Sequence, residues 1–293
     1  MRVADGWKQY RILDASDGEK LEDWNGICLI RPDPQIIWKT PYKSEKWQAA
    51  DGHYIRSSAG GGQWQFRREI PKDLTVSYML GKKSKLTFAI KPMNFKHTGL
   101  FPEQAVNWEF MYDRITDAGR EINVLNLFAY TGGATLACAA AGATVCHVDA
   151  SKGMITHAKL NAELSGLSDK PIRWIVDDCE KFIRREIKRG RKYDVIIMDP
   201  PSYGRGPGGE VWKLEECIYE LVCLAAELLS ENPLFFLINS YTSGLSASVM
   251  GYILAEVTNG RFAAVLCDEI GLPVETGKMP LPCGATAQLT VGK

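Results

Sequence analysis

The sequence predicts a doubly wound α/β domain at residues 111–293, preceded by a small β-rich domain at residues 1–110. From residue 123 onward, continuous apolar runs alternate with helical segments, as in a parallel sheet covered on both faces. Before residue 110, the apolar runs are short and separated by Gly, Pro, Asp and Ser, which is typical of a small β-sheet. Charge divides at the same place, with 17 Lys and Arg against 13 Asp and Glu in the front part, and 18 against 22 behind it.

The front part also holds six of the eight tryptophans. They fit the core of a small sheet or its contact with the second part, and this interpretation is preferred. Exposed aromatics with a positive bias would instead suit nucleic acid, but the bias is weak. The six are Trp7, Trp24, Trp38, Trp47, Trp64 and Trp108.

The second part reads as alternating elements in order. Its apolar runs predict strands at 123–129, 144–150, 171–178, 193–201 and 234–240. Between them the pattern predicts helices at 132–142, 151–166, 179–190 and 214–229. A helix at 246–260 and a final hairpin of strands at 262–270 and 286–292 complete the sheet.

Composition excludes the disordered and membrane-spanning classes. With 45% hydrophobic and 24% charged residues, the chain has an ordinary soluble composition, and no run approaches the roughly 20 apolar residues needed to cross a bilayer. A cytoplasmic protein with no membrane partner is therefore expected. The eight cysteines are scattered without a CxxC and the four histidines show no ligand spacing, so we expect buried thiols and no metal site.

Candidate site residues come from the ends of the predicted strands, because ligands bind beyond the carboxyl ends of such sheets. The second strand ends in Asp149, whose carboxylate can accept hydrogen bonds from both hydroxyls of an adenosine ribose. That role suits NAD and S-adenosylmethionine (SAM) equally. The turn at 131–135 does not supply the G-x-G-x-x-G that a dinucleotide needs, so SAM, which has no phosphates, fits better.

The fourth strand ends in the sequence DPPSY, residues 199–203. Two prolines impose a rigid backbone without N–H donors, which leaves carbonyl groups and the Asp199 carboxylate facing the site. Such acceptors can orient an amine or a base edge near a sulfonium methyl group, with Tyr203 available to stack. Taken alone, Asp-Pro-Pro could also be a bare turn.

With these motifs the sequence resembles the class I SAM-dependent methyltransferases, which have a Rossmann-like fold, and within them the large-subunit ribosomal RNA methyltransferase I and K group. The resemblance rests on NLFAYTGG, VDASKGMITHAKLNAEL, DDCEKFI and VIIMDPPSY. It extends into the front part, where KHTGLFPEQ at 96–104 is similar to the T-G-x-x-x-D-Q segment of that group, which closes over the cofactor.

The resemblance implies a role for each matching residue. For SAM it implies contacts from Phe128, Tyr130, Thr131 and Gly132 to the methionine part, from Asp149 and the neighbouring Ser151 to the ribose, and from Asp178 and the Cys179 backbone to the adenine. Thr98 and Gln104 would contact the cofactor, or would only pack the two domains together. The residues facing the methyl acceptor would be Asp199, Pro200 and Pro201, with Ser202 and Tyr203 binding substrate.

The sequence departs from this methyltransferase group at two points, and both bear on which acceptor is methylated. Members that methylate C5 of cytosine need a cysteine nucleophile in a turn after the fifth strand, and here Thr242 takes that position. A nitrogen or oxygen acceptor, which needs alignment and no covalent intermediate, is therefore expected. The chain also lacks a segment resembling the extra RNA-binding domain of methyltransferase I, which weighs against RNA.

The predicted function is SAM-dependent methylation of RNA, with ribosomal RNA favoured. A small molecule or a protein is the alternative substrate, and a non-catalytic SAM-binding module the alternative class. A groove lined by Arg67, Arg68, Lys82, Lys83 and Lys85 would favour RNA, although these charges also fit a solvated surface. Residues 205–209 predict a flexible loop beside the acceptor site that orders when substrate binds. The oligomeric state is left open.

Overall fold

The computed structural model describes residues 1–40, 44–57, 61–93, 95–205, 211–242, 244–262 and 264–290. Within them, eight strands form one large sheet: β1 (Arg2–Val3), β9 (Asn123–Leu127), β10 (Thr144–Asp149), β11 (Ile172–Val176), β12 (Val195–Met198), β15 (Phe235–Ser240), β16 (Ala264–Leu272) and β17 (Leu281–Thr290). They lie side by side in the order β1-β16-β17-β15-β12-β9-β10-β11. The five strands from β11 to β15 in this order are parallel, and β17 is antiparallel to β15 and β16.

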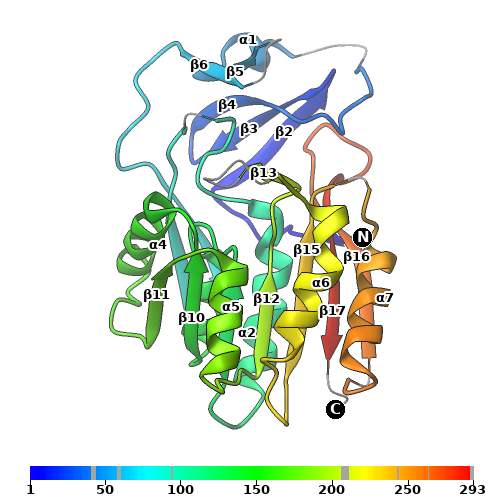
Figure 1. The fold of residues 1–293 in the computed structure, drawn as a ribbon. Helices are drawn as coiled ribbons and strands as arrows, with labels where there is room; N and C mark the ends of the chain where they lie inside the picture. Colours follow the sequence, from blue (N-terminus) through cyan, green and yellow to red (C-terminus); the bar gives the residue numbers. More distant parts are fainter. Residues whose placement is uncertain are drawn as a thin grey trace.

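Helices cover both faces of this sheet, which confirms the predicted doubly wound α/β fold. The helices are α2 (Ala105–Thr116), α3 (Gly133–Ala140), α4 (Lys152–Leu164), α5 (Cys179–Lys188), α6 (Leu214–Ala226) and α7 (Ala247–Thr258). Alternate residues of β12 separate the faces: Ile196 and Met198 pack with α5, α6 and α7, in front in Figure 1, and Val195 and Ile197 pack with α2 and α3. The strands read as continuous apolar runs because both of their faces are buried.

A smaller sheet lies above the large one in Figure 1. Its strands are β2 (Tyr10–Ser16), β3 (Glu19–Trp24), β4 (Ile27–Pro32), β5 (Gly52–Arg56) and β6 (Gly62–Phe66), with the short helix α1 (Glu45–Gln48) before β5. The parallel strands of the large sheet point their carboxyl ends toward it, so the small sheet covers the edge where ligands bind in this fold.

Two of the front tryptophans serve the two structural roles expected, whereas Trp38 is 40% exposed. Trp24 is fully buried in the core cluster below the small sheet. The ring of Trp7 lies 4.7 Å from that of Tyr78 and 6.1 Å from that of Trp108, so it joins the front part to helix α2. Tilted and edge-on ring pairs of this kind stabilise an internal contact as they do a core.

Several elements link the two parts of the chain. The β7 (Thr75–Leu80) and β8 (Ser84–Ala89) hairpin is tied to α4, because Asn161 Oδ1 accepts a hydrogen bond from the Ala89 N–H at 2.9 Å. Strand β1 belongs to the large sheet, where it pairs with the end of β16. Helix α2 spans residue 110, so the division into residues 1–110 and 111–293 cuts a helix and stays a prediction.

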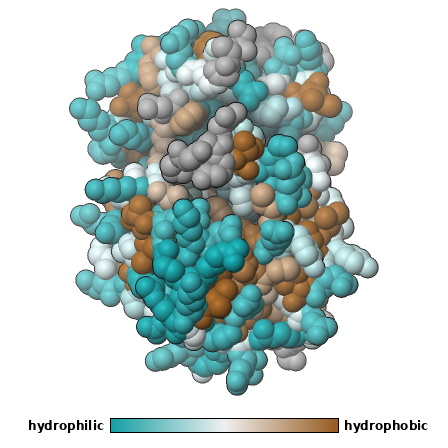
Figure 2. Space-filling view, in the orientation of Figure 1, coloured by the Kyte–Doolittle hydropathy of each residue, from teal (hydrophilic) through white to brown (hydrophobic). Residues whose placement is uncertain are grey.

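The surface helices keep one polar face. On the face shown in Figure 2, hydrophilic side chains cover α5, and apolar ones show in smaller areas between the helices. Phe182 and Ile183 of α5 point into the core, and Arg184 and Glu180 pair on its outer side. Among the described residues, no helix combines the length and the apolar character required to span a bilayer.

Candidate active site

The loop after β9 has an unusual backbone. Phe128, Tyr130 and Gly132 have φ angles of 55°, 50° and 91°, a left-handed region that bulky residues rarely adopt. Two partners hold it: the Phe128 N–H donates to Cys179 Sγ at 3.3 Å, and the Tyr130 N–H donates to Asp149 Oδ2 at 2.8 Å. Such conformations persist where neighbouring structure fixes them, and they are frequent at functional sites.

Asp149 ends β10 and faces this loop. Its Oδ1 accepts from the Ser151 N–H at 2.8 Å, so both carboxylate oxygens are oriented by backbone donors. Burial raises the pKa of Asp149, and the two N–H donors oppose that change. Ser151 in turn caps α4, because its Oγ accepts from the Met154 N–H at 3.4 Å. The predicted ribose pair therefore lies together beside the loop.

Asp178 and Cys179 follow β11 and begin α5. Asp178 caps this helix, with Oδ1 accepting from the Lys181 N–H at 2.9 Å. Cys179 is buried against the Phe128 N–H, and burial raises the pKa of its thiol. A buried neutral thiol is a poor nucleophile, so the side chain of Cys179 serves in packing and not in catalysis.

The segment at 96–104 forms another wall. Thr98 is fully buried, and its Oγ1 has no hydrogen-bond partner among the described residues. The next residue, Gly99, accepts a hydrogen bond at its carbonyl from Thr131 Oγ1 at 2.7 Å. Gly99 has φ 91°, and a Cβ there would lie 2.8 Å from the ring of His157. The segment is therefore clamped against the loop after β9.

Gln104 is held by a buried polar network. Its Nε2 donates to the Tyr241 hydroxyl at 2.7 Å, and its Oε1 accepts from Asn107 at 2.8 Å and from Asn239 at 3.1 Å. These contacts pack the segment onto α2 and β15. Gln104 also lines the pocket described below, so its packing role and a cofactor contact are compatible.

Asp199 follows β12 directly. Its Oδ1 is buried without a partner among the described residues. Burial, and after it the negative charge of Glu103, raise the pKa of Asp199 to about 7. Pro200 is buried and Pro201 is exposed, and the Pro201 carbonyl accepts from Trp212 Nε1 at 2.6 Å. A buried carboxyl oxygen without a partner is costly, and such groups mark sites that bind a donor.

Ser202 and Tyr203 lead away from this point into a surface hairpin, β13 (Tyr203–Arg205) and β14 (Val211–Lys213). The side chain of Tyr203 is 53% exposed. The predicted loop at 205–209 lies outside the described residues except for the backbone of Arg205.

One pocket collects the predicted residues Gln104, Phe128, Tyr130, Thr131 and Asp199. Its full lining is Leu100, Phe101, Gln104, Trp108, Asn126, Phe128, Ala129, Tyr130, Thr131, Gly133, Ala134, Ile197, Asp199 and Asn239. The other predicted residues are not part of this lining. They are Thr98, Gly132, Asp149, Ser151, Asp178, Cys179, Pro200, Pro201, Ser202 and Tyr203.

Some pocket residues were missed by the sequence analysis. Asn239 lies next to the last residue of the fifth strand, so reading the strand ends could have found it. Phe101 lies within the 96–104 motif, where its ring packs 5.4 Å from that of Tyr130 and 5.3 Å from that of Tyr241. Nothing in the sequence around Trp108 predicts that it lines the pocket. A Cβ on Gly133 would come within 2.5 Å of the Trp108 ring, so this glycine permits the close contact below the pocket.

Comparison with known proteins decides the family. The profile of the family described as S-adenosylmethionine-dependent methyltransferase matches residues 81–229, about half of the chain. The chain belongs to this family. A solved SAM-dependent methyltransferase from Agrobacterium tumefaciens is 34% identical, with a TM-score of 0.88 over 99% of this chain and 93% of that one. The resemblance and the cofactor predicted from the motifs are thus confirmed: this methyltransferase uses SAM.

Curated relatives cover smaller parts of the methyltransferase. Ribosomal RNA large subunit methyltransferase K/L of Shewanella frigidimarina (strain NCIMB 400) is 30% identical over 75% of this chain and 29% of its own. Ribosomal RNA large subunit methyltransferase I of Aeromonas salmonicida (strain A449) is 37% identical over 38% of this chain and 27% of its own. The chain therefore spans less than a third of the length of these two relatives.

Polar groups in and beside the pocket suit SAM. Thr98 Oγ1 and Asp199 Oδ1 are buried and have no hydrogen-bond partner among the described residues. Each can therefore bind a polar atom of the cofactor or the substrate. Asp149 presents a carboxylate already oriented by two N–H groups. The N-terminus of α3 follows the left-handed Gly132, where a helix dipole favours a carboxylate such as that of the methionine part.

Proposed function

We propose that this methyltransferase transfers the methyl group of SAM to a nitrogen or oxygen of RNA, with ribosomal RNA favoured and no covalent cysteine intermediate. The observation that carries the proposal is the buried Asp199 carboxylate, with one unpartnered oxygen, at the pocket and directly before two prolines. The names of the two ribosomal RNA methyltransferase relatives support RNA as substrate. Such a substrate would be met in the cytoplasm.

The role proposed for each cofactor-binding residue follows from its place at the end of a strand or in the 96–104 segment. Asp149, with Ser151 beside it, binds the ribose hydroxyls. The loop residues Phe128, Tyr130, Thr131 and Gly132 surround the methionine part, and Asp178 with the Cys179 backbone meets the adenine. Thr98 and Gln104 hold the closing segment against SAM. When bound, SAM supplies an electrophilic methyl group on a sulfonium.

For the acceptor, Asp199 would take a hydrogen bond from an N–H of the substrate and so aim the nitrogen at the methyl group. It can then remove the proton that the nitrogen loses. Pro200 and Pro201 keep the backbone rigid and free of competing donors there. A nitrogen acceptor is favoured over a hydroxyl, because a hydroxyl oxygen needs a stronger base than a carboxylate to lose its proton. Ser202 and Tyr203 are proposed to contact the substrate beyond the acceptor atom.

Covalent catalysis through the turn after β15 is not supported. The Thr242 hydroxyl donates to Glu215 Oε1 at 2.6 Å, and a threonine hydroxyl held in this way is not a thiolate. The described lining of the pocket contains no cysteine. These observations support a direct transfer of the methyl group.

A pH dependence follows from Asp199. Because its raised pKa lies at about 7, the carboxyl is protonated below that pH and cannot accept from the substrate. We expect kcat/KM to rise as pH increases through about 7 and to level off above it. An Asp199→Asn variant should show a low, flat profile over the same range. The same rise in the variant would assign the titration to another group.

The proposed substrate is tested by transfer of labelled methyl from SAM into total RNA from cells that lack the gene. Nucleosides are resolved by mass spectrometry, with the Asp199→Ala protein as control. We expect one labelled N- or O-methyl nucleoside that the variant does not produce. No label from protein that binds SAM would redirect the assignment to a small molecule or a protein.

A further inference from the structure

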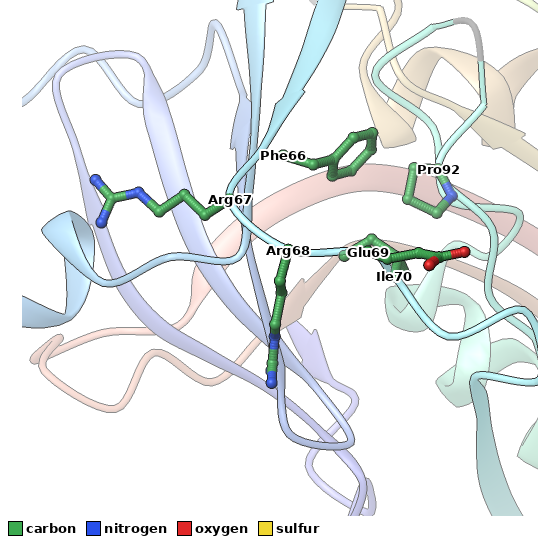
Figure 3. A pocket seen from close by; sticks show the side chains of 6 residues that line it. All are labelled: Phe66, Arg67, Arg68, Glu69, Ile70 and Pro92. Atoms are coloured by element: carbon green, nitrogen blue, oxygen red, sulfur yellow. The ribbon is translucent and has the colours of Figure 1, made fainter.

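Two aromatic rings lie stacked at the surface of the small sheet. Phe66, at the end of β6, is 47% exposed, and its ring lies 5.5 Å from that of Trp64 with only 9° between the planes. Figure 3 shows Phe66 facing Pro92 at a surface hollow of the chain. Because Trp64 stacks on it, Phe66 is a fixed, flat surface on which another ring can stack.

This surface connects to the cofactor pocket through one segment. Trp64 Nε1 donates to the carbonyls of Met93 at 2.8 Å and Phe95 at 3.2 Å. The Sδ of Met93 in turn accepts from the hydroxyl of Tyr130, which lines the pocket, at 3.8 Å. Phe95 itself is 65% exposed. Phe66 and Phe95 are thus linked through Trp64 and Met93 to a residue that lines the pocket.

Positive charge gathers around the same segment. The guanidinium of Arg31 donates to the Lys96 carbonyl at 3.1 Å. Burial lowers the pKa of the Lys96 ammonium, and the charges of Lys20, Arg31 and Arg56 lower it further, against the opposing charge of Asp33. Lys20 and Arg31 are themselves paired with Glu22. The cations considered for a phosphate are therefore Lys96, whose Nζ donates to the Pro32 carbonyl at 3.4 Å, and the exposed Arg56.

The field of these cations reaches the mouth of the pocket. His97 packs its ring 5.3 Å from that of the pocket residue Phe101. Burial lowers the pKa of His97 to about 4, followed by the charges of Arg31, Lys96 and Lys20. His97 is therefore neutral at pH 7 and adds no charge at the mouth of the pocket.

The charged residues that line the hollow are Arg67, Arg68 and Glu69, and their side chains are not placed to bind a phosphate next to Phe66. Arg68 forms an ion pair with Asp51 at 2.6 Å, and Figure 3 shows Arg67 pointing away from Phe66 and Pro92. Glu69 points to the side of Pro92, where it would repel a phosphate. Phosphates are therefore expected on the side of Phe95 and Lys96. The hollow does not include Lys82, Lys83 or Lys85, so the five-cation groove predicted from the sequence is not assembled there.

We infer that Phe66, Phe95, Arg56 and Lys96 bind the single-stranded RNA next to the methylated nucleotide, an inference that rests on the proposed RNA substrate. The two rings stack on unpaired bases, and the two cations bind the phosphates between them. Exposed rings interleaved with cations suit a single strand, because its bases are free to stack. We name these four residues the RNA strip.

The test is the affinity for a labelled single-stranded RNA oligonucleotide of mixed sequence, measured by fluorescence anisotropy at several salt concentrations. Phe66→Ala should weaken binding about tenfold, since stacking on one base is lost. Phe66→Tyr should bind nearly as the wild type does. Lys96→Ala should weaken binding about threefold and reduce the salt slope by about 0.7, the value for one phosphate contact of a single strand.

Matched controls remove similar groups elsewhere. Tyr252→Ala removes a ring that is 73% exposed on α7, and Lys83→Ala removes a cation from the β7–β8 turn, where Ser84 contacts Tyr112 of α2. Both should bind RNA as the wild type does. All variants should keep the SAM affinity of the wild type, because none of these side chains is part of the pocket lining.

The outcomes separate this inference from the proposed function. If the wild type binds and methylates RNA but Phe66→Ala binds equally well, the RNA strip is wrong and the RNA function stands. If the wild type neither binds nor methylates RNA, the function fails and the RNA strip with it. Binding of polyglutamate with the same affinity and the same dependence on Phe66 would assign the strip to an acidic peptide.

Discussion

Replacing Asp199 with alanine should lower kcat for methyl transfer by at least about 100-fold, the usual scale for a group that accepts a proton or aligns the acceptor. The affinity for SAM should stay within about threefold, because Asp199 is proposed to contact the methyl acceptor and not SAM. Stability should not fall, since the variant removes a buried carboxyl that burial disfavours. Single-turnover transfer and calorimetric SAM binding measure the two quantities separately.

The Asp199→Asn variant is the matched comparison. It keeps the size of the side chain and one accepting oxygen, so it should align the acceptor but take no proton. We expect its kcat to lie between those of the wild type and Asp199→Ala. A wild-type kcat in both variants would remove Asp199 from the reaction and leave the pocket as a cofactor site alone.

Replacing Asp149 with alanine should weaken SAM binding by at least about 30-fold, or about 2 kcal/mol. Each hydrogen bond to a charged group contributes about 1.5–3 kcal/mol, and the ribose offers two hydroxyls. The same carboxylate accepts from the N–H groups of Tyr130 and Ser151, so the variant should also melt at a lower temperature. SAM binding is measured by calorimetry at a temperature where the variant is still folded, so that a loss of affinity is not confused with unfolding.

Asp177 provides the control for Asp149. It lies at the end of β11, near the same edge of the sheet, but its carboxylate pairs with Arg185 of α5. Its Oδ1 also accepts from the Asp178 N–H at 2.9 Å, so Asp177→Ala should lower the affinity for SAM far less than Asp149→Ala does. Equal affinity in Asp149→Ala and the wild type would overturn the assignment of the ribose to Asp149.

The sequence predicted the large sheet well, because its signals are local. Each buried strand is a continuous apolar run, and each run ends in residues that the sheet brings to one edge, such as Asp149 and Asp199. The family followed from motifs at these ends. The individual roles of the site residues remain predictions, because they depend on where SAM and the substrate bind.

Other features depend on contacts between distant residues, which leave no local pattern. Asn239 orients Gln104 by donating a hydrogen bond to it, and nothing in the sequence near either residue predicts this contact. Trp108 supports the pocket floor only because α2 packs on α3, which places its ring against Gly133. Strand β1 is too short to recognise by alternation, although it completes the edge of the large sheet.

The pairing of β1 with β16 also sets an order of events during synthesis. Residues 2 and 3 are synthesised long before their partners Ile270 and Gly271. Through Arg2, which donates to Asn107 Oδ1 at 2.9 Å, this late pairing reaches the network that orients Gln104. Contacts so distant in sequence form slowly, because a long loop must close first. We therefore expect the cofactor pocket to reach its final order only after the last strands of the sheet have been made, so that truncated chains cannot hold SAM as the full sheet does.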